Sequence, residues 1–169
     1  YFPVPAAETS AGTQRTDKKG DLLGGDETVL IVDDDAIGTI DGVGPTNADR
    51  LEGFTITGGE GFFRDSPGGD PDFLVGGGIF VFGASSPTIT NNIIENNSAS
   101  NGAGIAASDS SAVIVGNIVR DCLGFLGGGL YFSYSSLIIR DNTISNNDAV
   151  VGGGISCYGS DPVIERNII

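Results

Sequence analysis

Apolar positions recur with one fixed period through residues 76–169. Isoleucine or valine returns every 25 residues in two columns, and asparagine does so in a third. The columns are Ile89, Ile114, Ile139, Ile164; Ile94, Val119, Ile144, Ile169; and Asn92, Asn117, Asn142, Asn167. A fixed period in this range indicates stacked repeats.

Short stretches inside each repeat alternate apolar and polar residues, which predicts strands with one buried face. Each repeat opens on a glycine-rich segment where the backbone can bend, at residues 76–78, 102–104, 127–129 and 152–154. The alternation directs two further columns into the core, which are Ile79, Ile105, Leu130, Ile155 and Val81, Ala107, Phe132, Cys157. We predict an all-β solenoid with three short strands in each coil of about 25 residues, the coils spaced by about 4.8 Å.

The repeat begins before the glycine segments. Residues 28–32 give the first strand signal, and residues 1–27, which have no apolar period, are expected to form an N-terminal arm or cap. Leu51 aligns with Ile139 and Ile56 with Ile144, so that Phe54 takes the place of the column asparagine. We therefore expect the solenoid to span residues 28–169.

One insertion interrupts the period. The step from Ile56 to Ile94 is 38 residues instead of 25, and the excess lies in a loop at about residues 59–75. Loops that leave a regular scaffold often carry binding groups. This loop either packs its aromatic residues against the solenoid as a cap or binds a ligand; the residues concerned are Phe62, Phe63 and Phe73.

Composition narrows the function classes. The chain has 169 residues, 28 of them glycine, and a formal net charge of −14 with no histidine. This length suits one domain, and a surface this acidic repels nucleic acid and anionic lipid. No apolar run is long enough for a membrane span. The chain starts at Tyr1 without an initiator Met, which is typical of a processed or excised product, and we expect a secreted or cell-surface protein.

Three adjacent carboxylates, Asp33, Asp34 and Asp35, follow the first strand directly. Because they repel one another, they form either a solvated turn or a cation site. Oxygen ligands suit Ca²⁺, although the alternating ligand spacing of a helix–loop–helix calcium site is missing. Calcium is the one cofactor that the sequence suggests, and nothing else in the chain requires one.

The asparagine column has a structural interpretation. Asparagine tolerates unusual backbone angles and bonds to nearby backbone, and stacked amides bond to one another. Asn97 and Asn147 repeat the pattern one bend later, with Cys122 between them. Cys122 and Cys157 fall in different columns, so we expect two thiols that fill apolar space instead of a disulfide.

Three segments carry a resemblance to a known family: LEGFTITGG (51–59), GGGIFVFGASSPTITNNIIENNSA (76–99) and GGGISCYGSDPVIERNII (152–169). They resemble the right-handed parallel β-helix repeat family of the pectin-lyase-like superfold, which implies a single-stranded right-handed parallel β-helix. That family includes polysaccharide lyases and hydrolases, surface adhesins and secreted bacterial proteins. The resemblance implies a bacterial secreted protein, and fold alone does not choose among the activities.

An enzyme of this superfold would need a base beside carboxylates, or clustered aspartates on one outer sheet. No column gathers aspartates. Arg140 and Glu165 share a column 25 residues apart, which predicts a surface ion pair across adjacent coils. We therefore assign no catalytic residue, and a polysaccharide lyase or glycoside hydrolase is the alternative function.

Outward aromatic residues favour binding over catalysis. Phe80, Tyr131 and Tyr158 are expected to point away from the core near one face, where rings stack on sugars. The opposing interpretation is a set of scattered surface aromatics. We take these three residues, with Arg140 and Glu165, as the candidate polysaccharide-binding residues.

Two outward columns are unexpectedly apolar, namely Thr88, Val113, Ile138, Val163 and Ile93, Ile118, Thr143, Ile168. A flat apolar face is typical of a lateral contact, and the sequence stops at Ile169 without a polar capping repeat. The chain is either a fragment or is covered at that end by another chain. We expect a structural, adhesive or glycan-binding module that self-associates into a homo-oligomer or filament, with residues 1–27 as a partner segment.

Overall fold

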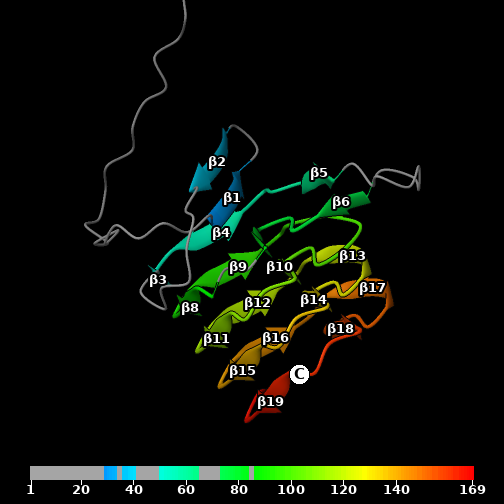
Figure 1. The fold of residues 1–169 in the computed structure, drawn as a ribbon. Helices are drawn as coiled ribbons and strands as arrows, with labels where there is room; N and C mark the ends of the chain where they lie inside the picture. Colours follow the sequence, from blue (N-terminus) through cyan, green and yellow to red (C-terminus); the bar gives the residue numbers. More distant parts are fainter. Residues whose placement is uncertain (1–28, 34–35, 41–49, 65–72, 84–85) are drawn as a thin grey trace, which may run out of the picture.

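Strands are the only regular elements in the described part of the protein. The computed structural model describes residues 29–33, 36–40, 50–64, 73–83 and 86–169, of which residues 29–33, 36–40, 62–64 and Phe73 are described by their backbone. Successive coils stack in one direction from β8 down to β19 (Figure 1). This arrangement confirms the parallel β-solenoid. Across the same ranges, no helix has the length and apolar character needed to cross a membrane.

Sheet A holds the strand that follows each glycine segment. Its four coil strands pair in parallel, with Ile79, Ile105, Leu130 and Ile155 in register. The strands are β7 (Ile79–Phe82), β10 (Ile105–Ser108), β14 (Leu130–Ser133) and β18 (Ile155–Tyr158). In each coil, the strand that follows the glycine segment therefore stacks on the corresponding strand of the coil before.

Sheets B and C hold the two strands that come next in each coil. All their pairings are parallel, and Ile89, Ile114 and Ile139 lie in register in sheet B. Sheet B is β3 (Arg50–Glu52), β8 (Thr88–Thr90), β11 (Val113–Val115), β15 (Ile138–Arg140) and β19 (Val163–Glu165). Sheet C is β4 (Thr55–Thr57), β9 (Ile93–Glu95), β12 (Ile118–Arg120) and β16 (Thr143–Ser145).

The three sheets enclose one apolar core. Side chains alternate along every strand, so each strand contributes its inward residue to a continuous stack. Phe132, Leu130 and Ile139 are fully buried. Cys157 belongs to the same inward column as Phe132 but is exposed, because β18 is the outermost strand of sheet A.

The N-terminal strands depart from the coil pattern. The predicted first strand is present as β1 (Val29–Asp33), but it pairs antiparallel with β2 (Ala36–Ile40) and with β7. Two residues join β1 to β2, and so short a connection allows only antiparallel pairing, whereas a parallel pair needs a long crossover. This hairpin therefore extends sheet A instead of forming the first parallel coil that we expected from residue 28.

The first regular coil starts at β3, where Leu51 pairs with Ile89, and continues at β4, where Ile56 pairs with Ile94. The insertion leaves this coil as an antiparallel hairpin of β5 (Phe62–Arg64) and β6 (Phe73–Val75), which projects to one side in Figure 1. The side chains of Phe62, Phe63 and Phe73 lie outside the description.

Two coils carry a fourth strand where we expected three strands in each coil, and these extra strands form sheet D between sheet C and the next glycine segment. It consists of β13 (Leu123–Leu126) and β17 (Asp148–Val151), which pair in parallel. Single bridges continue the same stack through Asn101 to Val75 of the insertion hairpin. The inserted hairpin thus lies at one end of sheet D.

Candidate functional site

The asparagine column forms a continuous ladder inside the corner between sheets B and C. The Nδ2 of Asn92 donates to Oδ1 of Asn117, and that of Asn117 donates to Oδ1 of Asn142, each at 3.0 Å. Asn142 donates to Asn167 at 2.9 Å. Each amide also bonds the carbonyl of the previous coil, as Asn117 does to Ile89 at 2.8 Å. These amides hold the coils together and do not face a ligand.

The unusual backbone angles lie one residue before the ladder and not on it, which differs from our expectation. The left-handed positions are Asn91 (φ 55°), Gly116 (φ 69°), Asp141 (φ 58°) and Arg166 (φ 53°). This residue turns the chain through the corner, and the ladder amide that follows then points inward. The left-handed turn and the stacked amide hydrogen bonds, which we expected from one asparagine, therefore belong to two neighbouring residues.

A second, imperfect ladder runs through the next corner. Asn97 Nδ2 donates to the Ile56 carbonyl at 3.1 Å, but in the next coil it meets the sulfur of Cys122, at 4.0 Å, in place of an amide oxygen. The backbone N–H of Cys122 donates to Asn147 Oδ1 at 3.1 Å. Burial raises the pKa of the Cys122 thiol, although the hydrogen bonds from Asn97 oppose this shift. Cys122 is therefore a buried, protonated filler, and both cysteines are free.

The predicted binding residues do not form one surface. Phe80 does point away from the lumen of the solenoid, but only 4% of it is exposed because it packs with Val75 and Ala106. Its ring stacks on Phe82, with 5.3 Å between centroids. Phe80 is thus a second-layer core residue and is not available to a ligand, which corrects the expectation for this position.

Tyr131 and Tyr158 do share a face, the outer side of sheet A. Tyr131 pairs with Ser156, and Ser133 pairs with Tyr158, so the two tyrosines lie diagonally on adjacent strands. The ring of Tyr134 joins them: it meets the Tyr158 ring edge to face, at 5.4 Å between centroids and an interplanar angle of 87°. Both rings are well exposed, at 61% and 60%.

We call this surface the aromatic patch and define it as Phe82, Asp109, Tyr131, Tyr134 and Tyr158. Phe82 and Tyr158 lie at the two ends of one column, with Ser108 and Ser133 between them. The two serine hydroxyls bond to each other at 3.1 Å, and Ser108 also donates to Asp109 at 3.1 Å. The patch combines exposed rings with hydroxyl groups and one carboxylate.

Tyr134 is positioned by its own turn. It adopts φ 50° in a column whose other members are Gly83, Asp109 and Gly159, all with positive φ. The ring lies over Gly159, where an added Cβ would come within 2.9 Å of Tyr134 Cε1. The pKa of Tyr134 is raised, chiefly by the side-chain hydrogen bond with Tyr158, then by the charges of Tyr158 and Asp109, so the phenol stays a neutral donor.

Sequence reasoning missed Tyr134, Phe82 and Asp109. A signal was present for the two turn residues, because they align with Gly83 and Gly159 in a column that glycine marks as left-handed. A large or charged residue in such a column must project from the turn. That projection places Tyr134 and Asp109 at the rim of the sheet.

Arg140 and Glu165 lie elsewhere, on the outer side of sheet B. Their Cα atoms are partners across β15 and β19, as expected, yet no ion pair joins them in the described structure. Arg166 instead binds Asp141, with Nε to Oδ1 at 2.7 Å, and this hydrogen bond lowers the pKa of Asp141. Arg120 binds Glu95 in the same way, one coil step away. These exposed pairs are surface contacts of small net stability.

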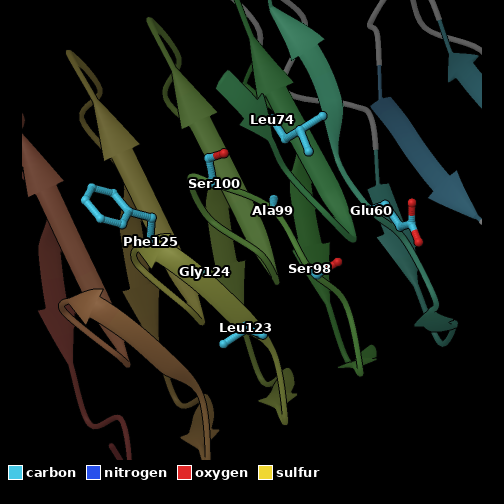
Figure 2. A pocket seen from close by; sticks show the side chains of 8 residues that line it. All are labelled: Glu60, Leu74, Ser98, Ala99, Ser100, Leu123, Gly124 and Phe125. Atoms are coloured by element: carbon cyan, nitrogen blue, oxygen red, sulfur yellow. The ribbon is translucent and has the colours of Figure 1, made fainter. Parts of the chain in front are cut away.

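A shallow open hollow lies between sheet D and the insertion hairpin. Phe125 borders it at one side and Glu60 at the other, with Ala99 between them (Figure 2). Its described lining is Glu60, Leu74, Ser98, Ala99, Ser100, Leu123, Gly124 and Phe125. Among these residues, one carboxylate and two serines supply few convergent polar side chains, and Phe125 is the single aromatic ring.

The calcium expectation falls largely outside the described residues. Asp34 and Asp35 are not described, and of Asp33 only the backbone is. Within the described ranges, no three acidic, cysteine or histidine side chains come together as a metal site. The arm at residues 1–27 is also outside the description.

One family model matches most of the chain. It is described as a right-handed β-helix region and covers residues 27–169. No curated protein and no solved structure was found to match at a significant level.

Proposed function

We propose that this chain, which belongs to the right-handed β-helix family, is a non-catalytic, secreted or cell-surface glycan-binding module, and that its binding surface is the aromatic patch. The observation that carries the proposal is the exposed edge-to-face pair of Tyr134 and Tyr158 on a rigid sheet. Exposed aromatic rings that are fixed in orientation lose little entropy on binding. A secreted location follows from a ligand that lies outside cells.

The chemistry of the patch suits a sugar. The negative face of a phenol ring attracts the polarised C–H groups of a pyranose, and ring contact removes apolar area from water. The hydroxyl of Ser133 and the carboxylate of Asp109 can pair with sugar hydroxyls at the rim. Because the patch extends along the outer side of sheet A, across strands of successive coils, it suits the side of an extended chain more than the end of a small molecule.

A catalytic role has less support from the described carboxylates. Glycoside hydrolysis needs two carboxyl groups about 5–10 Å apart around one bond. In the aromatic patch the only carboxylate is Asp109. Three of the four arginines with described side chains pair with carboxylates away from the patch, as Arg166 does with Asp141; the other two are Arg50 and Arg120.

Affinity gel electrophoresis against a panel of neutral, anionic and cationic polysaccharides tests the proposal. The wild-type protein should be retarded by at least one polysaccharide, and Tyr158→Ala should abolish the retardation. Phe125→Ala is the matched control, since it removes an aromatic ring of similar exposure (52%) from sheet D. If Phe125→Ala rather than Tyr158→Ala abolishes retardation, the hollow is the binding surface. Release of reducing ends or unsaturated products would favour the lyase or hydrolase instead.

A second candidate function, lateral self-association, has its own support. The outer column of sheet B exposes Ile138 (40%) and Val163 (48%) as partners on adjacent parallel strands, and sheet C exposes Ile118 (39%). Contiguous exposed apolar side chains of this kind are typical of contact surfaces. Static light scattering over a concentration series, with and without Ca²⁺, should then give a mass above 17.2 kDa. Ile138→Lys should restore the monomer, while Val150→Lys on sheet D should not; a wild-type monomer throughout would exclude this function.

A further inference from the structure

The two exposed rings of the aromatic patch form a right-angled corner. Tyr134 and Tyr158 lie at 87° to each other, on successive coils. The ring faces on the open side of such a corner both carry the negative part of the aromatic quadrupole. Two faces that meet in this way attract a cation more strongly than a single ring does.

A carboxylate lies beside the corner. Asp109 occupies the same turn as Tyr134, one coil earlier, so their Cα atoms are about 4.8 Å apart. The backbone N–H of Asp109 donates to the carbonyl of Ser133, directly before Tyr134, and the backbone N–H of Tyr134 donates to the carbonyl of Tyr158, so Tyr134 lies between the coils of Asp109 and Tyr158. Asp109 is exposed and its carboxylate is held toward the face by the Ser108 hydroxyl.

No positive side chain lies on the coil strands of sheet A. Their sequences are IFVF, IAAS, LYFS and ISCY, which contain neither lysine nor arginine. The four arginines whose side chains are described belong to sheets B and C or to the corner between them; they are Arg50, Arg120, Arg140 and Arg166. The whole chain has a net charge of −14, and the described coil strands of this face carry no cation, so they repel an anionic polysaccharide.

We infer that the ligand of the aromatic patch is an ammonium-bearing glycan, a polymer of amino sugars that are not acetylated, and that an ammonium group lies in the corner between Tyr134 and Tyr158 beside Asp109. This inference rests on the proposed glycan-binding function and names its substrate class. The sugar rings stack along the face while the ammonium gains cation–π attraction and the charge of Asp109. A neutral glycan gains only the stacking of its sugar rings.

Asp109→Asn isolates the charge. Asparagine tolerates the left-handed angle of φ 53° at this position, and its amide oxygen still accepts the Ser108 hydrogen bond. Asp148→Asn is the matched control, because Asp148 is an exposed carboxylate on β17 of sheet D and its removal changes the net charge equally. Tyr158→Leu keeps an apolar side chain while removing the ring. Unfolding midpoints should show that all three variants fold.

Binding is measured by isothermal titration calorimetry at one fixed salt concentration. The probes are glucosamine oligomers, N-acetylglucosamine oligomers of equal length, and galacturonate oligomers. Glucosamine oligomers should bind most tightly. Asp109→Asn should weaken that binding about fivefold, the scale of one exposed ion pair, and Tyr158→Leu about tenfold, while Asp148→Asn changes it less than about twofold.

Each other outcome overturns the inference. If acetylated or galacturonate oligomers bind as tightly as glucosamine oligomers, glycan binding stands but the ammonium assignment falls. Equal losses for Asp109→Asn and Asp148→Asn would mean that net charge alone attracts the polycation. If none of the three oligomers and no polysaccharide of the panel binds, the proposed function fails with the inference.

Discussion

Two columns of residues run through the same coils and obey different rules. The inner column repeats one residue, as Asn92, Asn117, Asn142 and Asn167. The outer column of sheet A changes at almost every coil, as Phe82, Ser108, Ser133 and Tyr158. Each inner amide must satisfy the next, so replacing one leaves two coils with unpaired polar groups. The outer residues vary from coil to coil, because the stacking of the coils does not require one repeated side chain at these positions.

Breaking the inner column should have the largest effect. Asn117→Ala leaves the backbone N–H and Nδ2 of Asn92 without their acceptor and removes the donor to Ile89. Buried polar groups without partners cost about 1–3 kcal/mol each, and three groups lose a partner here, so we expect a loss of about 3 kcal/mol or more. Equilibrium unfolding in urea measures it.

Asn167→Ala provides the internal control for that experiment. Asn167 likewise accepts from the N–H and Nδ2 of Asn142 and donates to the Ile139 carbonyl, but it is only half-buried, so water can replace these hydrogen bonds. Its loss should be less than half of that for Asn117→Ala. Equal losses at both positions would show that burial does not set the strength of the ladder.

Changes near the outer column of sheet A should reduce stability less than changes in the asparagine ladder, but they should weaken glycan binding more. Gly159→Ala places a Cβ at φ +56° and within 2.9 Å of the Tyr134 ring, so the ring must move. We expect about 1–2 kcal/mol of destabilisation from the left-handed angle and a clear loss of glycan retardation. Gly83→Ala is the control, because its φ is +72° but nothing lies within 4 Å of the added Cβ. This variant should lose a similar amount of stability and still bind the glycan. If both variants bind alike, the orientation of Tyr134 is unimportant.

Completing the second ladder with an amide should increase the stability of the protein. Cys122→Asn gives Asn97 a true acceptor in place of a sulfur at 4.0 Å and adds a donor toward the Ile94 carbonyl. One gained hydrogen bond should stabilise the protein by about 1 kcal/mol. A destabilised variant would indicate that this corner cannot accommodate an amide.

The same variant changes the response to alkaline pH. Burial raises the pKa of the Cys122 thiol above its ordinary value of 9.0, so the unfolded chain releases that proton at lower pH than the folded protein. The contribution to stability is complete below about pH 9 and is lost as the pH rises further. Unfolding midpoints measured between about pH 8 and 10.5 should fall more steeply for wild type than for Cys122→Asn.

The smallest effect is expected at an exposed ion pair. Arg166 lowers the pKa of Asp141, so this pair stabilises the fold above the ordinary carboxyl pKa of 3.8 and ceases to do so as the pH falls through the lowered value. Both side chains are largely exposed and are screened by salt. Asp141→Asn should therefore shift the thermal midpoint slightly at neutral pH and not at all in strong acid. A large shift in high salt would contradict this account.

Much of the architecture was readable from the sequence because stacking repeats the same environment in every coil. Leu51 and Ile56 were aligned correctly with Ile89 and Ile94 across the insertion, and the structure pairs them. The parallel solenoid itself is also as predicted. A residue that faces its own copy in the next coil is under the same constraint each time, so the constraint is visible as a period.

The candidate site was less readable, since exposure depends on what covers a face. Phe80 and Tyr131 occupy one outward column, but Val75 and Ala106 pack on Phe80 and bury it. Tyr134 gains its position from a left-handed turn and from the missing side chain of Gly159. Neither contact follows from the period of the sequence.

The sequence by itself determined the period, the inward columns and the fold class, because each of these repeats along the chain at a fixed step. Only the tertiary structure decided which outward aromatics stay exposed, that β1 joins sheet A antiparallel, and that Tyr134, Tyr158 and Asp109 meet at one rim. These features depend on which side chains and segments pack over each face, and the period of the sequence carries no information about that packing.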